Sequence, residues 1–364
     1  MKRDTKYLGS IGTKFEDGRK GISGSVGKTT TDYRGPFYTQ KGNQHSLSLD
    51  ALHKNGNRGF EGSYTNTRTN GRGIKIGKGD ISNTHSNERK YTLGGGVENN
   101  GRRYGNVGYQ AKNTNTQSFC YGDNKVSRSD YTARAHHISG GYRKSGNGRE
   151  IDGAYTRKDI NGQKYSFGKY SITRENEVRN TYNGKVNFGR NGGLATGGLE
   201  RYNQQIYKGK VGAIESSYSR KDYRNMQGGV NGSYRNGLFK GGFGGSYANG
   251  QTHTGRIGDA QITGGRENRI SGNIGITSSR KGVGIKGQGQ RSTKYTGGFS
   301  AGNLNVGGSF GQTQSVGGSA HINRNNFSIK GNYGQRYGVN GNGRIGNNKV
   351  GVNGHFSQNT YGGE

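Results

Sequence analysis

Several short motifs match patterns used in catalysis or nucleotide binding, but none has the spacing or context that its chemistry requires. Gly27-Lys28-Thr29 is similar to the end of a phosphate-binding loop. Five residues separate Gly21 from Gly27, whereas that loop requires four and a following helix. Ser300 and Ser309 each lie in a Gly-x-Ser-x-Gly pattern. A nucleophilic serine of this kind needs a strand–turn–helix context, and no helix pattern follows either serine.

Two further patterns fail for similar reasons. Residues 282–287 and 341–346 fit a dinucleotide-binding fingerprint by letter, but no alternation of strands and helices surrounds them. His136 and His137 are adjacent, and neighbouring residues of a strand point to opposite faces, so the pair cannot simply share a metal. Asp and Glu show no ligand spacing for Ca²⁺ or Zn²⁺. The sequence therefore predicts no catalytic residue, no cofactor-binding residue and no metal site, and it gives no basis for an enzyme.

Tyrosine beside a basic residue recurs along the chain. On a strand, one member of such a pair would point inward and the other outward, which accounts for most of the pairs. The alternative is that exposed tyrosines with a neighbouring cation support adhesion or oxidative cross-linking. The candidate tyrosines for that role are Tyr7, Tyr91, Tyr104, Tyr165, Tyr170, Tyr234, Tyr295 and Tyr337.

The charge is strongly basic, with 55 Lys and Arg against 22 Asp and Glu and a net charge of +33. Such a chain attracts polyanions. The basic residues are scattered and form no cluster of the nuclear-localisation type. Interleaved aromatic and basic residues could stack bases and neutralise phosphates, although no Arg-Gly-Gly triplet is present. A polyanion-binding protein, for nucleic acid or acidic polysaccharide, is therefore the alternative function.

The elements that would position these residues are strands. Hydrophobic residues make up only 26% of the chain and Gly accounts for 74 residues, so a conventional helical or α/β core is excluded. Alternation is clearest where Val316 to Ile322 run to a turn at residues 323–326 and Phe327 to Tyr333 return on the same parity. Asn-Gly, the strongest two-residue hairpin signal, recurs throughout. The spacing predicts a strand about every 10–12 residues and roughly 30 strands.

The predicted fold is all-β: a many-stranded antiparallel hairpin meander with stacked sheets that meet through Gly and aromatic inward faces. Gly241, Gly318, Gly331 and Gly354 fall on the inward parity and would allow a second sheet to approach closely. Residues 1–230 are richer in charge and less regular, and residues 231–364 are a regular Gly-rich hairpin region. A transmembrane helix is excluded because no run approaches 18 apolar residues. Cys120 is the only cysteine, so a disulfide scaffold is excluded.

Stretches such as Gly229-Val230-Asn231-Gly232-Ser233-Tyr234-Arg235 and residues 332–338 carry a resemblance in composition. The chain resembles the thread matrix proteins of mussel byssus and other Gly-rich secreted structural proteins. That resemblance implies an extracellular fibre, thread or coat. No signal peptide is predicted after Met1. Unprotected strand edges predict a homopolymer joined by edge-strand pairing, without a membrane span. An ice-binding surface is disfavoured because threonine is irregularly spaced.

Overall fold

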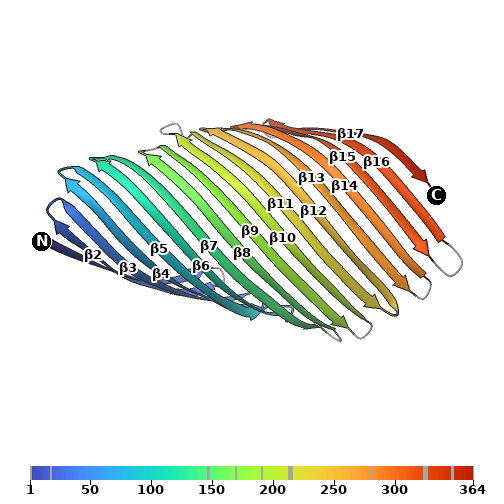
Figure 1. Ribbon diagram of the computed structural model, residues 1–364, viewed down its shortest axis with the longest axis horizontal. Helices are drawn as coiled ribbons and strands as arrows, with labels where there is room; N and C mark the ends of the chain where they lie inside the picture. The colour runs from blue at the N-terminus through green and yellow to red at the C-terminus, as the bar shows by residue number, and fades with distance from the viewer. Residues whose placement is uncertain are drawn as a thin grey trace. The chain divides into compact units, whose positions relative to one another are not determined.

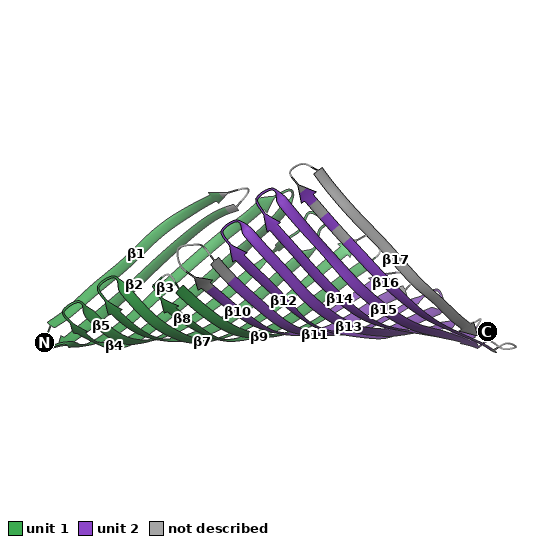
Figure 2. Ribbon diagram, turned by 90° about the horizontal axis from the view of Figure 1, so that it is seen from above, with its two compact units in different colours: residues 1–183 green, residues 184–364 purple. Residues whose placement is uncertain are grey.

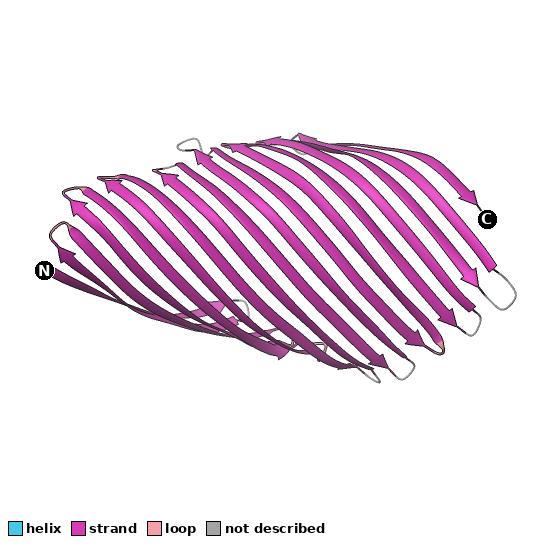
Figure 3. Ribbon diagram, in the orientation of Figure 1, coloured by secondary structure: helices cyan, strands magenta, loops and turns pink. Residues whose placement is uncertain are grey.

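The computed structural model describes residues 2–16, 19–145, 148–168, 170–189, 192–211, 216–279, 282–322, 327–345 and 348–363. Within these ranges the regular elements are all β-strands (Figure 3). Antiparallel strands follow one another as hairpins, so the predicted all-β hairpin meander is confirmed. No helix in the described part of the chain is long and apolar enough to cross a membrane.

The chain divides into two compact units, residues 1–183 and residues 184–364 (Figure 2). The division falls within β9, and the shift of composition that we placed near residue 230 stays a prediction. In chain order the strands, of which Figure 1 labels all but the first, are β1 (Lys2–Glu16), β2 (Arg19–Arg34), β3 (Phe37–Lys54), β4 (Asn57–Ile76), β5 (Gly79–Val97), β6 (Arg103–Tyr121), β7 (Asn124–Ser145), β8 (Gly148–Phe167), β9 (Tyr170–Gly189), β10 (Gly192–Val211), β11 (Ser216–Arg235), β12 (Leu238–Ile257), β13 (Ala260–Ser279), β14 (Gly282–Ala301), β15 (Leu304–Ile322), β16 (Phe327–Ile345) and β17 (Asn348–Gly363).

Within each unit, consecutive strands pair antiparallel in a single sheet. Neither unit contains a second sheet stacked on the first among its described residues, so the stacking that we expected is not found there. The predicted hairpin of β15 and β16 is confirmed, because Val316 pairs with Tyr333 and Ile322 with Phe327. Its turn at residues 323–326 lies outside the described residues.

The strands are about twice as long as the sequence spacing predicted. Typical lengths are 19 and 20 residues, because most Asn-Gly pairs do not turn the chain. Asn55-Gly56 and Asn236-Gly237 do turn it, with positive φ at both residues, as a type I′ turn requires. Asn249-Gly250 instead continues β12, where Asn249 pairs with Arg224 on one side and Asn268 on the other. Ladder pairing on both sides therefore overrides the local turn preference.

The hydrophobic residues do not form a core. Among the described side chains no hydrophobic residue is buried, and many large ones are exposed. Directly paired residues of an antiparallel sheet share a face, so the register shows where these side chains gather. In unit 1 they lie on the face that carries Phe37, Ile74 and Ile81, called here the apolar face of unit 1. The opposite, hydroxyl face carries cross-strand pairs such as Ser48 with Ser63 at 2.9 Å.

The glycines make room for aromatic rings of their own sheet. A Cβ atom at Gly241 would lie 3.0 Å from ring atoms of Phe239. On the hydroxyl face of unit 1, a Cβ at Gly162 would overlap the ring of Tyr131 in the neighbouring strand. The close approach that we predicted between stacked sheets is thus found between a glycine and a ring within one sheet.

Candidate functional site

An open groove of about 890 Å³ lies on the apolar face of unit 1, near the rim where β3 begins. Six apolar side chains from β3 to β8 form a row along it, each directly paired with the next across the sheet. The row consists of Phe37, Ile74, Ile81, Phe119, Val126 and Phe167. Tyr170 of β9 continues the lining, with its ring centroid 6.5 Å from that of Phe167.

Tight turns at this rim hold the row in place. Gly77 and Gly122 have φ of 57° in the turns after β4 and β6, a conformation that favours glycine. Because each turn reverses the chain within two residues, an apolar residue near the end of one strand is brought opposite an apolar residue near the start of the next. Ile74 thereby pairs with Ile81, and Phe119 pairs with Val126.

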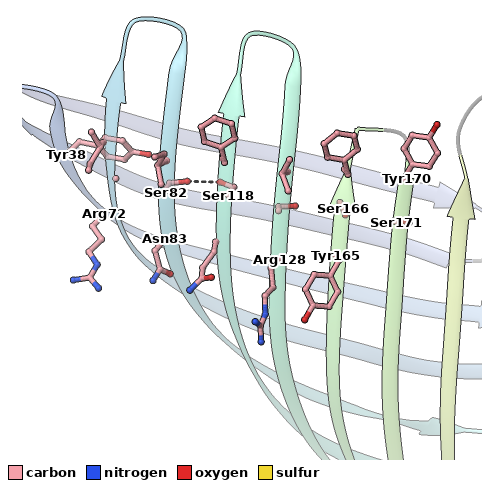
Figure 4. Close-up of a pocket in the computed structure, with 18 of the residues that line it drawn as sticks. Tyr38, Arg72, Ser82, Asn83, Ser118, Arg128, Tyr165, Ser166, Tyr170 and Ser171 are labelled. Atoms are coloured by element: carbon pink, nitrogen blue, oxygen red, sulfur yellow. Dashed lines mark hydrogen bonds between the residues drawn. The ribbon is translucent and has the colours of Figure 1, made fainter.

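A polar row borders the apolar row one alternate position further along the strands. Arg72 pairs with Asn83, Asn83 with Gln117, Gln117 with Arg128, and Arg128 with Tyr165. Figure 4 shows the labelled members of this row, Arg72, Asn83, Arg128 and Tyr165, on their separate strands. The groove therefore combines an apolar floor with a line of hydrogen-bond donors.

The two arginines of the polar row differ in their surroundings. Arg128 forms an ion pair with Asp130 at 3.1 Å, and its guanidinium lies 5.6 Å from the ring centroid of Tyr165. Arg72 is exposed and makes no hydrogen bond or ion pair with another described residue. Arg72 is therefore the cation of the groove that is available to a ligand.

The opposite face stiffens the strands that carry the groove. Ser82 and Ser118 are hydrogen-bonded at 2.7 Å, the dashed line of Figure 4. The Tyr38 hydroxyl donates to Asp80 Oδ1 at 2.9 Å. This bond passes over Gly73 of β4, where a Cβ would overlap the Tyr38 ring. Three neighbouring strands are thus tied together directly behind the groove.

The same arrangement of a tyrosine, a glycine in the next strand and a carboxylate in the strand beyond occurs twice more. Tyr131 donates over Gly162 to Glu175 Oε2 at 2.7 Å. In unit 2, Tyr223 donates over Gly250 to Glu267 Oε2 at 2.5 Å. We call these arrangements tyrosine ties. The sequence did not reveal them, since the three partners are far apart along the chain.

The tyrosine ties predict a loss of stability at alkaline pH. Burial raises the pKa of Tyr131 and Tyr223, and their hydrogen bonds to Glu175 and Glu267 raise it further. The unfolded chain therefore loses these phenolic protons first. The stability that the ties contribute is fully present below about pH 10, and it is lost as the pH rises from there through the folded pKa. Thermal melts from about pH 9 to about pH 12 should show the midpoint falling. The fall should be smaller in the Tyr131→Phe, Tyr223→Phe double variant, and an equal fall in both proteins would contradict this assignment.

The candidate tyrosines lie in different surroundings. Tyr165 and Tyr170 line the groove. Tyr91 stacks against Tyr64, with ring centroids 6.3 Å apart, and lies tilted against Tyr109, with ring centroids 5.1 Å apart. Tyr7, Tyr104, Tyr234, Tyr295 and Tyr337 lie on β1, β6, β11, β14 and β16. Apart from the shared groove of Tyr165 and Tyr170, the structure gathers them into no common site, and their roles in adhesion or cross-linking stay predictions.

Two of the candidate tyrosines have a basic side chain of the paired strand near the ring, and a third accepts a hydrogen bond. Lys28 Nζ lies 5.5 Å from the ring centroid of Tyr7, and Arg266 lies 5.4 Å from that of Tyr295. Gln335 Nε2 donates to the Tyr337 hydroxyl at 2.6 Å. These contacts join neighbouring or alternate positions of the sheet, as interleaved Tyr and basic residues allow.

The catalytic and nucleotide-binding patterns lie on strands. Residues 27–29 are within β2, Ser300 is within β14 and Ser309 is within β15. His136 lies on the apolar face, where its Nδ1 is 2.8 Å from the Tyr155 hydroxyl, and His137 is on the other face. Among the described residues no group of three or more His, Cys, Asp or Glu could hold a metal ion.

No protein-family model and no curated protein matches the chain. Similar solved structures include the outer membrane transporter YddB from Escherichia coli, with 6% identity, a TM-score of 0.30, and coverage of 98% of this chain and 74% of that chain. The ferric yersiniabactin uptake receptor FyuA from Yersinia pestis has 8% identity, a TM-score of 0.27, and coverage of 98% and 76%. The ferric citrate transporter FecA has 8% identity, a TM-score of 0.28, and coverage of 99% and 75%.

One of these neighbours is described as an outer membrane transporter, and the other two as an uptake receptor and a transporter. On this finding four of our predictions are corrected. The function as a self-assembling fibre, thread or coat is wrong, and so is the homopolymer joined by edge-strand pairing. The predictions of an extracellular location and of a chain without a membrane span are contradicted on the same finding. The identities and TM-scores carry no substrate over to this chain. The resemblance to thread matrix proteins was compositional, and composition does not distinguish a matrix protein from another basic, Gly-rich sheet.

Proposed function

We propose that the chain associates with anionic membranes by placing the apolar faces of its sheets against the lipid, and that it is not an enzyme. The observation that carries this proposal is the absence of any buried hydrophobic residue among the described side chains, although large apolar residues are aligned on one face. Exposed apolar surface of this extent marks a protein, ligand or membrane contact.

The apolar surface is sufficient to hold a membrane contact. In unit 2, Val230, Phe243 and Ile274 are directly paired on one face and are 61%, 56% and 40% exposed. Covering a large apolar side chain contributes about 1.5–3 kcal/mol. Because these side chains are already about half covered, each contributes roughly half of that. The many exposed apolar side chains of each unit together offset the loss of translational and rotational freedom on binding, which costs on the order of 4–15 kcal/mol.

The charge selects the kind of membrane. A net charge of +33 favours an anionic surface, because each Lys or Arg near such a surface contributes about 1 kcal/mol. Basic side chains can also lay their aliphatic stems along apolar surface while their charged ends reach the headgroups. Arg68 and Arg72 of β4 lie on the apolar face of unit 1, where they would be in reach of lipid phosphates.

Flotation of the full chain with vesicles tests this proposal. We expect co-flotation with vesicles of phosphatidylcholine and phosphatidylglycerol, and much weaker binding to phosphatidylcholine alone. Raising the salt from about 0.05 M to about 0.5 M screens exposed charges but leaves apolar contacts, so a substantial fraction should stay bound. Failure to float with anionic vesicles would overturn the proposal, and so would complete release by salt, which would indicate electrostatic attraction without insertion.

A further inference from the structure

We propose that the groove of unit 1 binds one long-chain amphiphile with an anionic head group, with its tail along the apolar row and its head at Arg72. This site lies within the apolar face of unit 1, but it takes a single dissolved molecule in a defined place, which a vesicle contact does not require. The inference goes beyond the proposed membrane association and does not depend on it.

The shape of the apolar row favours a linear tail. The row crosses six strands, from Phe37 in β3 to Phe167 in β8, and strands lie about 4.8 Å apart, so it is about 24 Å long. One apolar side chain per strand makes a narrow track. A compact ligand could touch only two or three of these side chains, whereas an extended hydrocarbon chain can contact all six.

The volume and lining fit a ligand site. A groove of about 890 Å³ lies within the roughly 300–1,000 Å³ range of small-molecule sites, which combine apolar walls with a few polar groups. Its apolar side chains lack cover, since Ile81 is 55% and Phe119 is 48% exposed. A tail laid on the row would remove that surface from water, which is the main source of affinity for an apolar ligand.

The charges beside the row favour an anionic head. Arg72 has no partner among the described residues, and the Asn83 amide lies directly opposite it. Two carboxylates on the strands of the groove are already engaged: Asp130 pairs with Arg128, and Asp80 accepts from Tyr38 on the other face. A guanidinium binds planar carboxylates and phosphates with two parallel hydrogen bonds. Carboxylate and phosphate heads share this chemistry, so the two are compared directly below.

Titration of the full chain with monomeric palmitate, below its micelle concentration, tests the proposal by calorimetry. We expect saturable binding of one molecule per chain. The Arg72→Gln variant should bind palmitate at least about ten-fold more weakly, since hydrogen bonds to charged groups are the stronger kind. The Arg68→Gln variant is the matched control, because Arg68 lies on the same strand and face but outside the groove lining. It should bind palmitate like the wild-type chain.

Two further arms identify the head and the tail. Hexadecyl phosphate replaces palmitate to distinguish a preference for phosphate from a preference for carboxylate. Hexadecanol lacks an anionic head, so it should bind the wild-type chain and the Arg72→Gln variant equally weakly. The Phe119→Ser variant should bind palmitate and hexadecanol more weakly, by a similar factor for both. An unchanged circular dichroism spectrum would show that this variant is folded. Absence of saturable binding, or equal affinity of wild type and Arg72→Gln for palmitate, would overturn the inference.

The outcome is separable from that of the vesicle experiment. Arg72 is one of 55 basic residues, so Arg72→Gln should float with anionic vesicles like the wild-type chain. Palmitate binding without flotation would remove only the membrane proposal. Flotation without palmitate binding would contradict only the ligand site in the groove.

Discussion

Replacing both Phe243 and Ile274 with aspartate is expected to lower the affinity of the chain for anionic vesicles by about 100-fold or more. The two side chains are directly paired on the apolar face of unit 2 and are exposed in the free protein. Their loss removes two apolar contacts with lipid. The new carboxylates also repel the anionic headgroups. Flotation or sedimentation over a range of lipid concentrations measures the change.

The matched control places the same charges on the same two strands but on the opposite face. Ser246 and Ser271 are directly paired there, and their replacement with aspartate should reduce vesicle binding only slightly. Equal losses in the two double variants would show that net charge alone decides binding, and would contradict a contact through the apolar face.

The Gly162→Val substitution is expected to lower the free energy of unfolding by about 2–5 kcal/mol. Gly162 is buried beneath the Tyr131 ring, and a Cβ there overlaps the ring. The valine must therefore displace Tyr131, which also removes the hydroxyl donor from Glu175. Thermal or denaturant unfolding followed by circular dichroism measures the loss.

Gly153→Val serves as the control in the same strand, because a Cβ at Gly153 has only an ordinary contact, 3.7 Å from the Ser139 carbonyl oxygen. Gly153→Val should lower the free energy of unfolding much less than Gly162→Val does. Tyr131→Ala should also be destabilising, but adding Gly162→Val to it should cost little more, since the ring that clashes is gone. Additive losses in the double variant would show that the ring and the glycine are independent.

The strands could be predicted from the sequence wherever alternation was regular. Val316 and Tyr333 were assigned to one face by parity alone, and the structure pairs them directly. Strand ends could not be located in the same way, because Asn-Gly has two outcomes. At Asn55-Gly56 it turns the chain, whereas at Asn249-Gly250 pairing on both sides keeps it extended.

The groove could not be predicted, because a sequence gives the parity of each strand but not the register between strands. Tyr165 and Tyr170 were recognised as candidates only for their neighbouring lysines. What places Tyr165 beside Arg128 is a pairing between β7 and β8. The sequence pattern of the 36 residues between the two positions does not by itself show where the chain turns, and the turn decides that pairing. The apolar row has the same origin, since its members each look like an isolated hydrophobic residue near a turn.

The tyrosine ties have a consequence for how the sheet finds its correct alignment. A slip of one residue between β7 and β8 would move Gly162 to the other face. A slip of two would restore the face but place Ile160 or Lys164 opposite Tyr131, where a side chain would occupy the space of the ring. Around Tyr223 the corresponding neighbours of Gly250 are Ala248 and Thr252. The hydroxyl-rich face of the sheet would accept many alignments. Each tie fits only one of them, and it therefore disfavours misaligned hairpins during folding.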